Sequence, residues 1–322
     1  MSPRPLSPDE VSRAREVLRR FLPKSPLRRS FAVGGESQAR LKLECWQPTG
    51  SFKVRGALNL LASLTPAERA RGVVAASAGN HALGVAFACE ALGGEIPATL
   101  FVPETAPGAK LDKLRSYPVT IHVQGATYDD AFALASAFAA QTGAVYVHAF
   151  DDPRTAAGQG TLGLEILEDL PEVESILVPV GGGGLLAAVA VAVKAVAPQV
   201  RLVAVQPEAS PALRESLREG RPLLNYPAGP TLADGLAGGI GEILWAHRGL
   251  VDEVVTVTED EIEDAIAALA SQDQVIAEGS GAVGVAALRA GRVRLGEGPV
   301  VAVVTGGNLE ASALARILSQ RL

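Results

Sequence analysis

The stretch ILVPV-GGGG-LLAAVAVAVKAV, residues 176–196, indicates the fold most directly. It begins with a short apolar, β-branched run typical of a buried strand and ends with a longer apolar run typical of a helix. A strand, a glycine turn and a helix in this order belong to the repeating unit of parallel α/β sheets. A plain turn needs one glycine, whereas four let the backbone approach a bound group closely, and the N–H groups of the helix start face an anion. The stretch therefore predicts an α/β fold with a phosphate site.

The same alternation of short β-branched runs and longer Ala-rich runs continues along the chain, which predicts a parallel sheet with helices on both faces. The predicted strands are residues 73–76, 98–102, 119–123, 144–148, 176–180, 202–206, 253–257 and 300–304. The predicted helices are residues 8–21, 82–92, 109–116, 128–142, 158–170, 185–196, 259–272, 282–290 and 310–320. Ligands of open α/β sheets bind outside the carboxyl ends of the strands, so the turns after the strands should carry the chemistry.

Composition excludes several classes of protein. The 322 residues allow roughly two domains, and a net charge of -6 argues against a nucleic-acid or acidic-membrane partner. Cys45 and Cys89 form no CxxC pair and the four histidines show no HExxH spacing, so neither a disulfide framework nor a zinc site is expected. Residues 1–20 contain no apolar signal-peptide core, and no stretch is apolar enough to span a membrane. We therefore expect a cytoplasmic protein that binds a small molecule.

The glycine turn is open to a second interpretation. Gly182, Gly184 and Ala187 match the dinucleotide fingerprint GxGxxA of nicotinamide-dependent dehydrogenases. That fingerprint also needs an acidic residue about 20 positions further on to bind the ribose. The next predicted strand ends at Gln206, with Glu208 just beyond it. The match is therefore poor, and it leaves the other motifs of the chain unexplained.

A lysine lies in an unusual context at PTGSFKVRGA, residues 48–57. Most lysines are solvated surface residues. Lys53, however, follows Phe52 and opens a helix-like run with few charges, so its amine is expected in a partly desolvated pocket. Such a pocket favours the neutral, nucleophilic form of the amine.

At this point the sequence resembles the serine/threonine dehydratases, also called threonine ammonia-lyases, which are fold type II pyridoxal 5′-phosphate enzymes. The five matching motifs are PTGSFKVRGA (48–57), SAGNH (77–81), GQGT (158–161), GGGGL (181–185) and TGGN (305–308). They occur in the family's order, and the resemblance extends over about residues 5–320. A chance match to one motif is plausible, whereas a chance match to all five is not.

The resemblance implies an α/β fold of two open, twisted, mostly parallel sheets with helices on both faces, and a small domain inserted into a large one. Residues 1–57 and 149–322 are expected to form the large, discontinuous domain that binds pyridoxal 5′-phosphate. Residues 58–148 are expected to form the small domain, which contributes the loop for the substrate carboxylate.

The resemblance also implies a role for each motif. Lys53 bonds covalently to the cofactor aldehyde and, once the substrate displaces it, takes the proton from the substrate Cα. Phe52 packs on the pyridine ring, and the hydroxyl of Thr305 donates a hydrogen bond to the pyridine nitrogen and leaves it unprotonated. The cofactor phosphate is bound by Gly181, Gly182, Gly183, Gly184 and Leu185. The substrate carboxylate is bound by the loop Ser77, Ala78, Gly79, Asn80 and His81, of which Asn80 also hydrogen-bonds the phenolic oxygen of the cofactor.

The implied reaction is β-elimination from an L-hydroxyamino acid. L-threonine gives 2-oxobutanoate and L-serine gives pyruvate, each with ammonia. An unprotonated pyridine nitrogen makes the cofactor a weaker electron sink, which suits a leaving group that departs soon after the proton is taken. The choice among threonine, serine and bulkier β-hydroxy amino acids depends on pocket shape and stays open. A homo-oligomer, either a dimer or a tetramer, is also expected.

Two other functions stay open. A serine racemase shares the lysine loop and the glycines, but it carries a serine at the position of Ala78 to protonate the opposite face of Cα, and a methyl group has no proton to give. Such racemases also bind a divalent cation through acidic residues after the strand at 202–206, where an ungapped alignment gives this chain Gln206, Ser210 and Ala212. Glu208 is the acidic residue nearby, so metal binding stays open. The second alternative is a non-catalytic protein that binds pyridoxal phosphate or an amino acid on the same fold.

Overall fold

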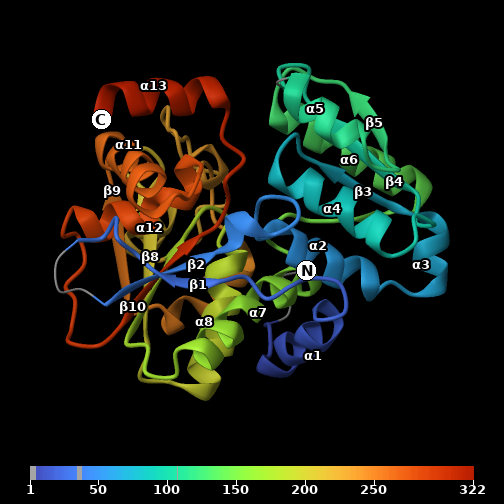
Figure 1. Cartoon of the computed structure of the whole chain (residues 1–322). Helices are drawn as coiled ribbons and strands as arrows, with labels where there is room; N and C mark the ends of the chain where they lie inside the picture. The colour runs from blue at the N-terminus through green and yellow to red at the C-terminus, as the bar shows by residue number, and fades with distance from the viewer. Residues whose placement is uncertain (1–4, 35–37, 107) are drawn as a thin grey trace.

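The computed structural model describes residues 5–34, 38–106 and 108–322. Its strands form two sheets, each at the centre of one lobe, and Figure 1 shows the larger lobe at the left and the smaller lobe at the upper right. The N-terminal and C-terminal parts of the chain share the larger sheet, because strand β10 pairs with β2. The smaller lobe is therefore built by a middle segment of the chain.

The larger sheet has the order β1-β2-β10-β7-β8-β9 among the described residues. Its neighbours pair in parallel, except that β1 is antiparallel to β2. The strands are β1 (Leu27–Arg29), β2 (Ala39–Leu43), β7 (Ser175–Pro179), β8 (Arg201–Pro207), β9 (Glu253–Val257) and β10 (Val300–Val304). The parallel strands bring their carboxyl ends to one edge, where the glycine turn and the TGGN turn meet.

Both faces of the larger sheet are buried because each strand sends alternate side chains to opposite sides. In β10, Val301 and Val303 join one hydrophobic core, whereas Ala302 and Val304 join the other. The first core is covered by α1 (Pro8–Leu18), α7 (Pro153–Asp169), α8 (Gly184–Val196), α9 (Ala212–Glu219) and α10 (Glu242–His247). The second is covered by α11 (Glu259–Ala268), α12 (Gly279–Arg289) and α13 (Ala311–Arg321). Short helical turns occur at η1 (Glu44–Trp46), η2 (Asp234–Leu236), η3 (Arg248–Leu250) and η4 (Leu269–Asp273).

The smaller sheet has the order β5-β4-β3-β6 among the described residues, and all its pairs are parallel. Its strands are β3 (Val73–Ala76), β4 (Ala98–Val102), β5 (Thr120–Val123) and β6 (Val145–Tyr146). One face packs against α2 (Lys53–Ala62), α4 (Asn80–Ala91) and α5 (Gly108–Arg115), and the other packs against α6 (Tyr128–Thr142). Helix α3 (Pro66–Arg71) leads into β3. Helix α2 also packs against α7 of the larger lobe, so it joins the two lobes.

The α/β prediction is confirmed, and each of the eight predicted strands has a counterpart in the described chain. Strands β1 and β2 were not predicted, because charged residues such as Arg40 and Lys42 interrupt their apolar pattern. Helix α7 begins at Pro153, earlier than the predicted 158, because the carboxylate of Asp152 caps it by accepting from the N–H groups of Arg154 and Thr155. Helices α3, α9 and α10 were also missed.

The strands of the smaller sheet all lie within the predicted small domain, residues 58–148. Its first boundary falls inside helix α2, which contacts both lobes, so the exact division stays a prediction. In the described part of the chain, no helix combines the length and the apolar character that crossing a membrane requires.

Candidate functional site

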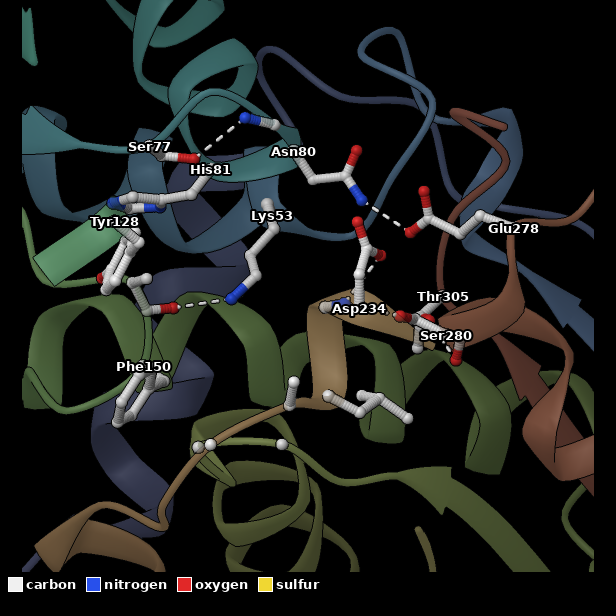
Figure 2. Close-up of a pocket in the computed structure, with 18 of the residues that line it drawn as sticks. Lys53, Ser77, Asn80, His81, Tyr128, Phe150, Asp234, Glu278, Ser280 and Thr305 are labelled. Carbon is white, nitrogen blue, oxygen red and sulfur yellow. Dashed lines mark hydrogen bonds between the residues drawn. The ribbon is translucent and has the colours of Figure 1, made fainter. Parts of the chain in front are cut away.

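A cavity of about 1850 Å³ lies between the lobes and is lined by residues from both. Figure 2 shows Lys53 pointing into it, between the loop that carries Ser77 and Asn80 and the side chain of Thr305. The glycine turn also lines this cavity. Of the predicted site residues, the cavity is lined by Phe52, Lys53, Ser77, Gly79, Asn80, His81, Gly181, Gly182, Gly183, Gly184, Leu185 and Thr305. Ala78 is not among them.

Lys53 is the first residue of α2, and the turn before it is fixed to the turn after β10. The Phe52 N–H donates to the carbonyl oxygen of Thr305 at 3.0 Å, and Ser51 forms a bridge with Gly306. The Lys53 Nζ donates to the carbonyl oxygen of Ala149 at 3.0 Å and lies 5.1 Å from the centroid of the Phe52 ring.

The surroundings of Lys53 favour a neutral amine. Desolvation by burial lowers the pKa of Lys53 to about 8, although the nearby carboxylate of Glu278 acts in the opposite direction. An ordinary lysine with a pKa near 10.5 is almost wholly charged at neutral pH. Lys53 therefore exposes a usable fraction of nucleophilic amine to the cavity.

The glycine turn between β7 and α8 packs closely on two side chains and one carbonyl group. A Cβ on Gly182 would lie 2.4 Å from the Phe150 ring, and one on Gly184 would lie 2.2 Å from the Phe150 carbonyl oxygen. Gly183 has a φ of 88°, and a Cβ there would lie 2.1 Å from Leu244. Larger residues are excluded, so bare backbone and the N-terminus of α8 line the cavity. This is a cradle for an anion such as a phosphate.

The loop between β3 and α4 presents a second helix N-terminus. The Ser77 Oγ accepts from the Gly79 N–H at 3.1 Å (Figure 2), and helix α4 begins at Asn80, with first-turn N–H groups that lack intrahelical acceptors. These groups suit a carboxylate. Ala78 instead packs its methyl group against the core of the smaller lobe, so the structure gives that side chain no place in the cavity wall.

The His81 side chain makes a structural hydrogen bond and does not serve as an acid for a ligand in the cavity. Its Nε2 lies 2.8 Å from the Val147 carbonyl oxygen, and the side chain is buried. Burial, with a smaller contribution from the charge of Lys53, lowers the pKa of His81 to about 3. The imidazole is therefore neutral and donates its Nε2 proton to Val147, which ties α4 to the end of β6.

Asn80 belongs to a hydrogen-bonded chain that crosses the cavity. Its amide nitrogen donates to Glu278 at 2.6 Å (Figure 2), and its amide oxygen accepts from Asn308 at 2.6 Å. Asn308 also accepts from Lys113 at 3.0 Å. Sequence reasoning missed the part played by Glu278 and Lys113. The small-residue run Gly279–Gly281 after Glu278 resembles the other glycine turns and was the available signal for Glu278.

Thr305 follows β10 and is buried at the edge of the cavity. Its hydroxyl donates to the carbonyl oxygen of Ser280 at 3.2 Å (Figure 2), while the Ser280 Oγ accepts from the Gly235 N–H at 3.0 Å. Donation from Thr305 to a ring nitrogen in the cavity therefore requires the hydroxyl to rotate away from Ser280.

Aromatic side chains form one wall of the cavity. The sequence did not indicate this wall, because its residues come from separate segments, helix α6 and the chain at and after β6. Tyr128, Phe132, His148 and Phe150 line the cavity, and with Tyr146 of β6 their rings follow one another with centroids 4.7 to 6.4 Å apart. The Nδ1 of His148 accepts from the N–H groups of Phe150 and Asp151. Burial lowers the pKa of His148, so this imidazole is also neutral.

Glu208, the candidate cation ligand, belongs to no cluster of potential metal ligands in the described part of the chain. No group of three or more His, Cys, Asp or Glu side chains among the described residues is placed to hold a metal ion. The side chain of nearby Gln206 is occupied, because its oxygen accepts from the N–H groups at the start of α9 and its nitrogen donates to the carbonyl oxygens of Val180 and Ser210. Whether Glu208 binds a cation stays open, as it did from the sequence.

The chain is similar in sequence to known proteins over nearly its whole length. The chain is 44% identical over 320 residues to L-threonine ammonia-lyase of Thermotoga maritima, covering 98% of this chain and 78% of that protein. It is 38% identical over 319 residues to the catabolic L-threonine dehydratase TdcB of Escherichia coli strain K12, covering 97% and 96%.

Solved structures of related enzymes superpose closely on this chain. Maize serine racemase superposes with a TM-score of 0.90 at 32% identity, covering 98% of both chains. The processed form of threonine deaminase isoform 2 from Solanum lycopersicum superposes with a TM-score of 0.89 at 32% identity, covering 99% of this chain and 96% of that one. The family model described as pyridoxal-phosphate dependent enzyme matches residues 19–306, which include Lys53, the Ser77–Gly79 turn, the glycine turn and Thr305. Because this model matches well over half of the chain, and relatives 38 to 44% identical match nearly all of it, the chain belongs to the pyridoxal-phosphate dependent enzymes, and pyridoxal 5′-phosphate is its cofactor.

Proposed function

We propose that this protein is an ammonia-lyase that converts L-threonine, L-serine or both into 2-oxobutanoate or pyruvate and ammonia. The observation that carries the proposal is the position of Lys53, whose amine has a pKa of about 8 and faces both anion-binding turns. The names of the relatives from Thermotoga maritima and Escherichia coli support the same reaction.

Each part of the site has a role in this proposal. The glycine turn and the start of α8 hold the cofactor phosphate, and the Ser77–Gly79 turn with the start of α4 holds the substrate carboxylate. Bound pyridoxal phosphate supplies an electron sink that acidifies the Cα–H bond of the substrate. Asn80, held between Glu278 and Asn308, presents its amide to the cavity.

Lys53 is the base in this proposal. Its neutral amine takes the Cα proton, the Cβ–O bond breaks, and the hydroxyl leaves as water once it is protonated. In the balanced reaction, the Cα proton and the β-hydroxyl leave together as water, so the proton that Lys53 takes is balanced by the proton that the hydroxyl receives. The released enamine tautomerises to an imine, which a second water molecule hydrolyses to the 2-oxo acid and ammonia. The carbonyl oxygen of Ala149 orients the amine, because it accepts a hydrogen bond from Nζ.

The test begins with the purified protein and pyridoxal 5′-phosphate. Borohydride reduction and peptide mapping should place the cofactor on Lys53, and 2-oxo acid should form from L-threonine or L-serine. Lys53→Ala should lose both the bound chromophore and the activity, by roughly 10³-fold or more. Cofactor binding without release of 2-oxo acid from any β-hydroxy amino acid would support a non-catalytic binding protein instead.

Serine racemase is the second candidate, because maize serine racemase is so similar in structure. Racemisation needs a proton donor on the face of Cα opposite Lys53. The methyl group of Ala78 has no such proton and packs on the core of the smaller lobe, which argues against this reading. Chiral chromatography of a reaction with L-serine decides between the two, since D-serine formed as fast as pyruvate would favour the racemase.

The proposal includes a homo-oligomer in the cytoplasm. The thiols of Cys45 and Cys89 are free and buried, which supports a reducing compartment. Size-exclusion chromatography with light scattering tests the oligomeric state, and fractionation of the source cells tests the location.

A further inference from the structure

A cluster of buried charges lies two residues along α2 from Lys53. It consists of Lys42 on β2, Glu44 on η1, Arg55 on α2 and Glu165 on α7. The side chains of Lys42, Glu44 and Arg55 are at most 1% exposed. The cluster is outside the cavity, and no step of the proposed reaction uses it.

Arg55 uses all five of its N–H donors within the cluster. Its Nε and Nη2 donate to the two carboxylate oxygens of Glu44 at 2.7 and 2.8 Å. Its Nη1 and Nη2 donate to the two carboxylate oxygens of Glu165 at 2.7 and 2.8 Å. The second Nη1 proton goes to the Thr161 hydroxyl at 3.0 Å. One guanidinium therefore fixes the helix of Lys53 to two other elements in a defined orientation.

The cluster is electrically balanced. Lys42 donates to Glu165 at 2.7 Å and to the Ser25 carbonyl oxygen at 2.7 Å, so two cations face two carboxylates. Buried ion pairs are often no more stabilising than apolar side chains of the same volume. Stability alone is thus a weak reason for this arrangement, whereas orientation is a sufficient one.

Helices α2 and α7 also touch through their backbones. A Cβ on Gly158 would lie 2.5 Å from the Arg55 carbonyl oxygen, and the Gly56 N–H donates to the Gln159 side chain at 3.2 Å. Helix α7 begins four residues after Ala149, whose carbonyl oxygen accepts from Lys53. The contact between α2 and α7 therefore sets both the backbone of Lys53 and the group that orients its amine.

We propose that Arg55 is a positioning residue for Lys53. By joining α2 to η1 and α7, it fixes the distance and direction of the amine relative to the Ala149 carbonyl and the glycine turn. The effect on turnover rests on the proposed lyase function, whereas the effect on bond formation between Lys53 and pyridoxal phosphate does not.

The experiment compares Arg55→Lys with Lys42→Met in the full chain. Arg55→Lys keeps the positive charge but loses the planar guanidinium and its paired hydrogen bonds. We expect kcat for L-threonine to fall by roughly 10- to 100-fold, because a small displacement of a reacting group has an effect of this size. The pH midpoint for imine formation between the apoprotein and pyridoxal 5′-phosphate, followed by absorbance, should also move upward. Lys42→Met removes a charge of the same cluster from an element that does not carry Lys53. It should lower Tm at least as much and leave kcat and the midpoint near the wild-type values.

Unchanged kcat and an unchanged midpoint in Arg55→Lys would overturn the proposal. The proposal would also be overturned if kcat fell in both variants in proportion to the fall in Tm, because a general loss of stability would then explain both results. If Arg55→Lys does not fold, Thr161→Val removes one of the five hydrogen bonds and should give a smaller change of kcat and midpoint in the same direction. A wild-type protein that forms the imine but releases no 2-oxo acid would refute the lyase function, while the imine midpoint of the variants would still decide the role of Arg55.

Discussion

The Nζ of Lys53 lies 3.0 Å from the carbonyl oxygen of Ala149, a residue 96 positions further along the chain. The bond joins the first residue of α2 to the segment between β6 and α7. A carbonyl oxygen accepts a hydrogen bond from the amine but carries no formal charge. It therefore orients Lys53 without holding the lysine in its charged form, as a carboxylate would.

The lowered pKa of Lys53 predicts the pH dependence of cofactor attachment. Burial disfavours the ammonium, so the amine becomes neutral as the pH rises through about 8 rather than through 10.5. The rate of imine formation by the apoprotein should therefore rise with pH, with a midpoint near 8 in stopped-flow absorbance. Glu278→Gln removes the carboxylate that opposes this shift and should move the midpoint to lower pH. A midpoint near 10 in the wild-type protein would contradict the assignment of a desolvated amine.

Gly184→Ala should damage the phosphate cradle. The new methyl group would meet the backbone carbonyl of Phe150, which cannot move aside as a flexible side chain would. We expect the free energy of unfolding to fall by roughly 1–3 kcal/mol, with weaker binding of pyridoxal 5′-phosphate. Thermal denaturation and cofactor titration measure the two effects. Gly249→Ala is the matched control, because a Cβ there meets nothing within 4 Å, and it should change neither.

Thr305→Asp should retain the cofactor but change what it does. A carboxylate beside the ring nitrogen would favour the protonated pyridine, which is a stronger electron sink. Elimination from L-threonine should slow and pyridoxamine 5′-phosphate should accumulate, as measured by absorbance and chromatography. Thr305→Ser keeps the hydroxyl and should behave as the wild type. An unchanged spectrum and rate in Thr305→Asp would show that this side chain does not face the ring nitrogen.

Local sequence patterns were enough to predict the parallel α/β architecture and the glycine turn that lines part of the cavity. Alternating apolar residues show where a strand is buried on both faces, and a glycine turn between strand and helix leaves bare backbone at a helix start. Both signals are contained in a few neighbouring residues. The glycine turn and the unusual context of Lys53 were recognised from neighbouring residues, whereas the roles of Ser77 and Thr305 came from the resemblance to the serine/threonine dehydratases. All of these residues line the same cavity.

The tertiary structure alone decided which distant groups complete the site. The partners of Asn80 are Glu278 and Asn308, 198 and 228 positions away. Strand β2 was missed because Lys42 makes it look exposed, yet Lys42 is buried against Glu165, 123 positions further on. A charged side chain is stable inside a protein only where an opposite charge and hydrogen-bond partners meet it, and the local sequence does not say which remote segment supplies them. The sequence by itself thus determined the strands, turns and reactive lysine, whereas long-range packing decided how that lysine is held.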